Sequence, residues 1–170
     1  MNRISIEIAL SILLSAFLGF IFGVYKERHA KHVLVHNAML LMENELHQCQ
    51  RQIRGLAKST VLSPLSRLPR SAYDSHWTTA VMAGDFTSAE VSLIAAFYSF
   101  VDQINRGLDQ AHEAKTRGDH KHLVQEAARV VMKANKVASK EGGNPEEDLF
   151  QAALDVVTNH KEAARRHKIF

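Results

Sequence analysis

The chain begins with a long block of mainly apolar residues. Several segments follow in which apolar residues recur at regular intervals. The block covers residues 4–25, and Glu7 is the only charged residue in it. At about 1.5 Å of rise per residue, some 20 apolar residues cross the roughly 30 Å hydrocarbon layer of a bilayer. The block is longer than the apolar core of a cleavable signal peptide, and no small-x-small cleavage site precedes Lys26. The pattern therefore predicts a transmembrane anchor over 1–25.

Small residues recur at every fourth position of this anchor. The stripe consists of Ser11, Ser15, Gly19 and Gly23. Small side chains let two helix backbones approach closely in a membrane, which favours self-association of the span. Glycine is also common in transmembrane helices, which is a simpler explanation of the same stripe. Glu7 lies on the same row, and we expect it either to reach the near headgroups or to face a partner helix.

Beyond the anchor, apolar residues recur at alternating steps of four and three. This seam consists of Val35, Met39, Met42, Leu46, Cys49, Ile53 and Leu56. A 3.5-residue period over about three heptads is typical of a coiled coil, or of a long helix packed along one partner. We interpret 26–62 as a juxtamembrane stalk helix that forms a dimer. Packing of the seam against the carboxyl-terminal domain is the competing use.

Proline and glycine divide the rest of the chain. Pro64 and Pro69 end the stalk pattern, which predicts a hinge loop over 63–72. A capping box, Thr87-Ser88-Ala89-Glu90, opens the longest of the following helical segments. We therefore predict an all-α fold with an antiparallel three- or four-helix bundle over 73–170. The predicted bundle core contains Trp77, Ile94, Phe97, Val101, Ile104 and Leu108, and the third segment turns an apolar face inward with Val124, Ala127, Val131, Ala134 and Ala138.

The distribution of charge and the cysteine content indicate where in the cell the chain resides. The formal net charge is +3, and the excess of Lys and Arg lies in 26–70, next to the apolar block. We predict a single-pass protein of the inner (plasma) membrane. The positive-inside rule favours a cytoplasmic carboxyl-terminal domain, and the opposite topology is the alternative. The single cysteine excludes an intramolecular disulfide framework, so the chain does not depend on an oxidising compartment.

The ten histidines are the main candidates for chemistry. His29, His32 and His36 share one helix face just outside the predicted span, where they are candidate metal ligands or pH-sensing groups. One helix presents them in a line, which is poor tetrahedral geometry, so a solvated basic face near lipid phosphates is the favoured interpretation. The sequence has no phosphate-binding glycine loop, HExxH, CxxC or nucleophile elbow. We therefore expect no catalytic residues, no enzyme activity and no cofactor.

One segment carries a resemblance. The run Tyr73-Asp74-Ser75-His76-Trp77, followed by Gly84, the pair Phe97-Tyr98 and Asn105, resembles a segment of uncharacterised bacterial membrane proteins that are helical and have a single span. The resemblance implies a bacterial membrane protein built from helices, and it implies no activity. Physical roles suffice for each residue: packed aromatics, a left-handed helix end at Gly84, and a buried or surface amide at Asn105.

The sequence thus predicts a non-enzymatic, dimeric scaffold or signalling adaptor. Its expected partners are membrane lipid, a second copy of itself and an unknown protein. Specific nucleic-acid binding is not expected, because basic and aromatic residues do not interleave. One alternative is a membrane effector, a small toxin or pore-former in which Glu7 and the small-residue stripe line an oligomer. Another is a metal or pH sensor based on the histidines of the stalk.

Overall fold

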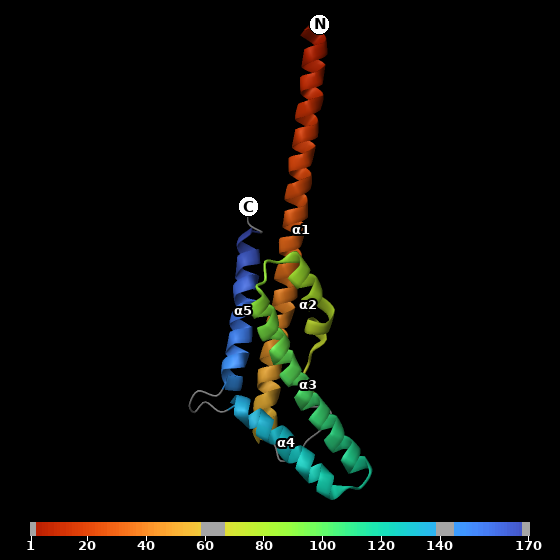
Figure 1. The fold of residues 1–170 in the computed structure, drawn as a ribbon, viewed down its shortest axis with the longest axis vertical. Helices are drawn as coiled ribbons and strands as arrows, with labels where there is room; N and C mark the ends of the chain where they lie inside the picture. Colours follow the sequence, from red (N-terminus) through yellow and green to blue (C-terminus); the bar gives the residue numbers. More distant parts are fainter. Residues whose placement is uncertain (1–2, 59–66, 139–144, 168–170) are drawn as a thin grey trace.

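The computed structural model describes residues 3–58, 67–138 and 145–167, and these residues form five helices without strands. The helices are α1 (Arg3–Lys58), α2 (Ser71–Ala83), α3 (Ser88–Thr116), α4 (His120–Ala138) and α5 (Pro145–His167). Figure 1 shows the first half of α1 standing clear of the molecule, while the other four helices gather around its second half. The predicted fold class is confirmed: a long apolar amino-terminal helix is followed by a helical bundle.

The first half of α1 has the properties of a membrane span. Every residue from 10 to 28 is exposed, and the apolar side chain of Phe22 is 70% exposed. A helix satisfies its backbone hydrogen bonds internally, so such an apolar surface suits hydrocarbon better than water. Within the described residues, α1 is the one helix that is long and apolar enough to cross a membrane. The side chain of Glu7 lies outside the described residues.

The second half of α1 is the centre of the bundle, where it packs against α2, α4 and α5. All seven seam residues are buried: Val35, Met39, Met42, Leu46, Cys49, Ile53 and Leu56. The interpretation of this seam as a dimer contact is therefore corrected, because helices of the same chain cover it. A heptad period shows which face of a helix is apolar, but it does not show whether the covering helix belongs to another chain. Within the predicted stalk, 26–62, the buried seam runs from Val35 to Leu56, and α1 continues to Lys58.

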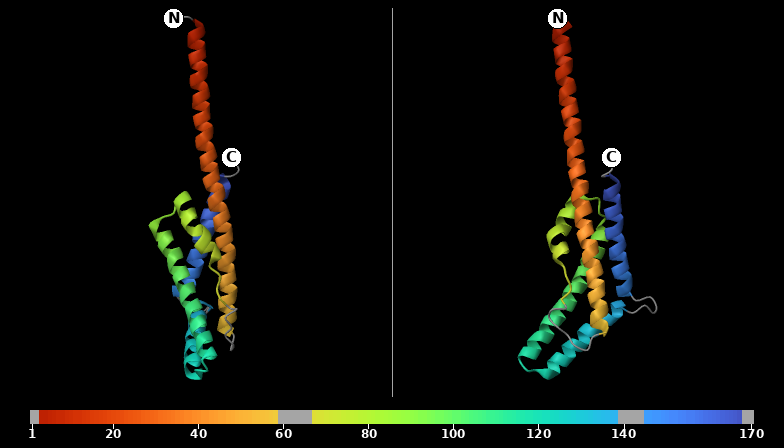
Figure 2. Two further views of the ribbon diagram at one scale, coloured as in Figure 1. Left: turned by 90° about the vertical axis from the view of Figure 1, so that its right-hand side faces the viewer. Right: turned by 180° about the vertical axis from the view of Figure 1, so that it is seen from behind.

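Of the described helices after α1, α3 runs away from the anchor, whereas α2, α4 and α5 run toward it. Figures 1 and 2 show α2 running back toward the anchor, α3 running away from it, and α5 ending beside the middle of α1. Helices α3 and α4 form a hairpin whose tip extends beyond the carboxyl end of α1 (Figure 2). Gly118 closes this hairpin with a φ of 73°, a left-handed conformation that glycine adopts without strain.

The predicted core and capping box are confirmed. The six predicted core residues, Trp77, Ile94, Phe97, Val101, Ile104 and Leu108, are all buried. Thr87 Oγ1 accepts a hydrogen bond from the Glu90 backbone N–H, and the Glu90 carboxylate accepts one from the Thr87 backbone N–H at 2.8 Å. This reciprocal pair satisfies two amides that the first turn of α3 would otherwise leave free.

Two local predictions are wrong. Gly84 has φ −110° and ψ 167°, an extended conformation instead of the predicted left-handed one. A Cβ at this position would lie 2.8 Å from the ring of Phe86, so the close approach of that ring requires glycine. Val124, assigned to the inward face of α4, is 65% exposed. The side chain of Ala138, from the same predicted face, lies outside the described residues.

Cys49 tests the burial of the seam. Its thiol lies 3.3 Å from the carbonyl oxygen of Pro69, and burial, with a smaller contribution from Glu45, raises its pKa to about 12. Because the thiolate is the reactive form, we expect the native protein to react very slowly with a maleimide at mildly alkaline pH and to form no interchain disulfide under oxidant. Thiol titration before and after guanidinium unfolding measures this. Fast labelling, or a Cys49-linked dimer, would show that the seam is open.

Candidate functional site

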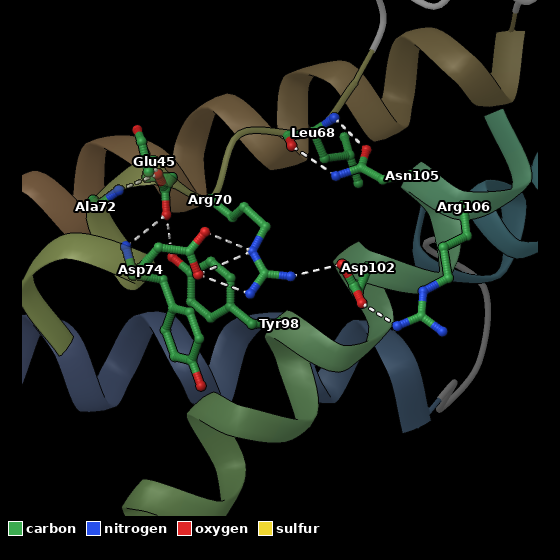
Figure 3. Close-up of polar contacts among 11 residues, drawn as sticks. Glu45, Leu68, Arg70, Ala72, Asp74, Tyr98, Asp102, Asn105 and Arg106 are labelled. Atoms are coloured by element: carbon green, nitrogen blue, oxygen red, sulfur yellow. Dashed lines mark hydrogen bonds and ion pairs between the residues drawn. The ribbon is translucent and has the colours of Figure 1, made fainter. Parts of the chain in front are cut away.

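A buried carboxylate on α1 holds the start of α2. Glu45 is 4% exposed, and it accepts hydrogen bonds from the backbone N–H groups of Ala72 at 2.7 Å and Tyr73 at 3.2 Å (Figure 3). The N-cap residue of α2, Arg70, makes no capping hydrogen bond with its side chain. Glu45 therefore caps α2 from another helix, where the free N–H groups and the helix dipole favour a negative charge.

The hydroxyl of Tyr98 on α3 donates to the same carboxylate at 2.7 Å. Burial raises the pKa of Tyr98 well above its usual range, and the neighbouring Glu45 carboxylate adds to this effect. The phenol thus stays a protonated donor, and its ring stacks on Tyr73 with the ring centroids 4.0 Å apart. Since Glu45 meets donors from both α2 and α3, this site binds parts of the chain to one another.

A second set of contacts fixes the segment that leads into α2. Asn105 accepts a hydrogen bond from the Leu68 N–H at 2.8 Å and donates one to the Leu68 carbonyl at 3.0 Å (Figure 3). Arg70 forms ion pairs with Asp74 at 2.7 Å and with Asp102 at 2.6 Å. The described part of the predicted hinge, 67–72, is therefore a fixed joint, while residues 59–66 lie outside the described residues.

The three candidate histidines of α1 lie near the point where this helix leaves the bundle. His29 stacks on Tyr25, and Nδ1 of His36 lies 3.2 Å from the carbonyl oxygen of Lys161. His32 lines a cavity of about 280 Å³ together with Asp85 and His160. Within the described part of the chain, no three His, Cys, Asp or Glu side chains are placed to hold a metal ion. The geometry gives no support to the metal-sensor alternative.

Two half-buried contacts set the position of α5, and the sequence analysis missed both. The ring of His160 stacks on Phe86 at 3.8 Å between centroids, and its Nε2 lies 3.1 Å from the Glu90 carboxylate. Lys161 forms an ion pair with Glu43 at 2.6 Å. His160 and Glu90 are 70 residues apart in the sequence, and Lys161 and Glu43 are 118 residues apart, so no local pattern links either pair. Of these four residues, the sequence pattern marked Glu90 alone, as part of a capping box.

The α3–α4 hairpin carries an open groove of about 230 Å³ between its helices. Cationic side chains dominate its charged lining, which comprises Arg106, Glu126, Arg129 and Lys133. Glu126 is buried and accepts a hydrogen bond from Arg129 at 2.5 Å. It is the only acid between residues 120 and 134, so the outward face of this part of α4 displays no carboxylate. Beside the groove, Val124 and Met132 are 65% and 57% exposed.

The small-residue stripe of the span, Ser11, Ser15, Gly19 and Gly23, lies fully exposed on α1. A Cβ added at Gly19 or Gly23 would meet no atom within 4 Å, so the stripe makes no contact with the bundle. Ser15 donates a hydrogen bond to the carbonyl of Ser11, within its own helix, at 2.9 Å. Self-association of the span stays a prediction.

The chain matches no protein-family model, and neither curated proteins nor solved structures give a match. The resemblance to bacterial single-span proteins therefore stays a prediction.

Glu45 is the side chain whose loss we expect to weaken the bundle most directly. Glu45→Gln replaces one acceptor oxygen by an amide donor that faces other donors, and we expect it to lower the free energy of unfolding by about 2–3 kcal/mol. Chemical unfolding in detergent, followed by circular dichroism, measures this. The matched control is Glu113→Gln on the exposed surface of α3, which should change stability by no more than about 0.5 kcal/mol. Equal effects of the two variants would contradict the capping role.

Proposed function

We propose that this protein is a non-catalytic membrane adaptor. In this proposal, α1 anchors the chain in a bilayer, and the α3–α4 hairpin presents a docking surface to an acidic segment of a partner protein. The observation that supports this most is the continuity of α1, which is both the apolar anchor and the buried centre of the bundle. The same helix therefore sets how far from the membrane a partner bound to the bundle can lie.

The length of α1 sets that distance. From Tyr25, where the apolar block ends, to Lys58 the helix extends by roughly 50 Å at 1.5 Å per residue. The hairpin tip lies beyond this end of α1 (Figure 2). The hairpin surface is therefore too far from the anchoring bilayer to contact its lipids, and a soluble partner or the soluble part of another membrane protein is its natural occupant.

The chemistry of the hairpin surface defines the partner. Lys121, Arg129 and Lys133 supply positive charge along α4, and Val124 and Met132 supply exposed apolar area between them. Charge complementarity calls for carboxylates on the partner, which steer association and fix its register. The exposed apolar side chains favour a protein over a nucleic acid, whose backbone offers them no apolar contact. We therefore assign an acidic, amphipathic segment as the occupant.

Dimerisation along the stalk is not part of the proposed function, because the seam is buried within the chain. Self-association through the span, a bacterial source and a cytoplasmic bundle stay predictions. In the described residues, no observation favours the pore-former or the histidine sensor.

A photocrosslinker at exposed Ala128, used in intact cells, tests the docking surface. We expect an adduct with a protein whose crosslinked peptide is rich in Asp and Glu. Met132→Glu should reduce the adduct at least about tenfold, because it adds a like charge at an interface that excludes water. Met82→Glu is the matched control: Met82 is 84% exposed, but it lies at the other end of the bundle. Similar adduct yields in the two variants, or no adduct, would overturn the assigned surface.

A further inference from the structure

Three segments meet at the end of the bundle that is nearest to the anchor. They are residues 26–34 of α1, the α2–α3 turn at 84–87, and residues 162–166 of α5. We call these three segments the near end. Figures 1 and 2 show the turn and the carboxyl end of α5 beside α1 where it emerges from the bundle. The near end therefore lies between the bundle core and the predicted span.

The register of α5 against α1 determines which residues of α1 lie level with the last turn of α5. The two helices run antiparallel, and the His36 ring nitrogen lies 3.2 Å from the Lys161 carbonyl oxygen. Four residues later along α5, Arg165 is therefore level with about His32 of α1. The cavity lined by both His32 and Ala164 agrees with this register. The half-buried pair of Lys161 and Glu43, at 2.6 Å, holds the register in place.

This register brings Arg165 and Arg166 close to the membrane surface. His32 follows Tyr25 by seven residues, or about 10 Å of helix. Tyrosine is typical of the membrane interface, and headgroups extend roughly 5–8 Å beyond the hydrocarbon layer. The last turn of α5 thus begins a few ångströms outside the headgroups, within the Debye length of about 8 Å at physiological salt.

The charge of the near end suits an anionic surface. Its cations are Lys26, Arg28, Lys31, Arg165 and Arg166, and its acids are Glu27, Asp85 and Glu162. Glu27 is already paired with Lys31 at 2.8 Å, whereas Glu162 lies 4.0 Å from Arg165, at the limit of an ion pair. Both arginines are exposed. Arg165 and Arg166 extend the positive charge of the anchor flank to a second helix.

We propose that the near end rests on the headgroups of the membrane that α1 spans, and that Arg165 and Arg166 bind anionic phospholipid there. This inference rests on the anchoring role of α1 in the proposed function, but not on the hairpin docking surface. One helix through a bilayer leaves the tilt of the bundle free. A second contact, on α5, restrains it.

The test uses the full chain in nanodiscs of phosphatidylcholine alone, or of phosphatidylcholine with phosphatidylglycerol. Hydrogen exchange of the last turn of α5 reports the contact, because bound arginines keep this helix end from fraying. We expect exchange to slow about fivefold or more in the anionic discs, the effect of roughly one cation at such a surface. High salt should abolish the difference, since it screens the attraction.

Charge reversal separates this contact from a general charge effect. Arg165→Glu with Arg166→Glu should remove the lipid dependence of exchange. Arg51→Glu with Arg54→Glu makes the same charge change on exposed positions of α1, roughly 40 Å from Tyr25. This control variant should retain the lipid dependence of exchange.

Three results would overturn the inference. Equal exchange in both kinds of disc would refute the headgroup contact while leaving anchor and hairpin untouched. Loss of the lipid dependence in the Arg51 and Arg54 variant as well would show that overall charge, not the near end, is responsible. Failure of the chain to enter discs would refute the anchor itself, and the headgroup contact with it. A missing hairpin adduct at Ala128 would leave all of these outcomes unaffected.

Discussion

The apolar stripe on the second half of α1 must be covered, and the rest of the structure depends on how this is done. Burying a large aliphatic side chain contributes about 1.5–3 kcal/mol, and the stripe contains Met39, Met42, Leu46, Ile53 and Leu56. Helices α2, α4 and α5 of the same chain cover these side chains. A dimer along this stripe would first have to displace α5 and break its ion pair from Lys161 to Glu43. Folding within one chain therefore takes the surface that a coiled coil would use.

Polar contacts then determine where two of the covering helices, α2 and α5, sit. Glu45 fixes the start of α2, because its carboxylate supplies the cap that Arg70 does not provide. His160 and Lys161 fix α5 against α3 and α1. Apolar packing alone tolerates sliding of one helix along another, whereas a half-buried ion pair loses its partner when the register slips. The distance of Arg165 from the predicted membrane surface is a consequence of this register.

Local sequence signals made the helices predictable. The contacts between residues far apart in the sequence could not be predicted in this way. The apolar block, the capping box at Thr87 and the six core residues follow from periodicity within one segment. The seam was also found, but the sequence could not decide between a second chain and the carboxyl-terminal domain as its partner, because periodicity carries no information about what covers a helix face. Glu45 looks like an ordinary polar position beside a heptad seam, and the segment that it caps lies 27 residues away. Val124 was misplaced because α4 carries apolar residues on two faces, of which the bundle covers one.

The continuity of α1 links the two ends of the bundle mechanically. Because the span and the core share one helix, a tilt of the span tilts the whole bundle with it. At the end of a lever of roughly 50 Å, a tilt of 10° displaces the hairpin by about 9 Å. The proposed docking surface, so far from the predicted span, has a defined position only when something besides the span restrains the tilt. The arginines of α5 stand at the short end of this lever, where a contact with the membrane has to resist the displacement of the long end.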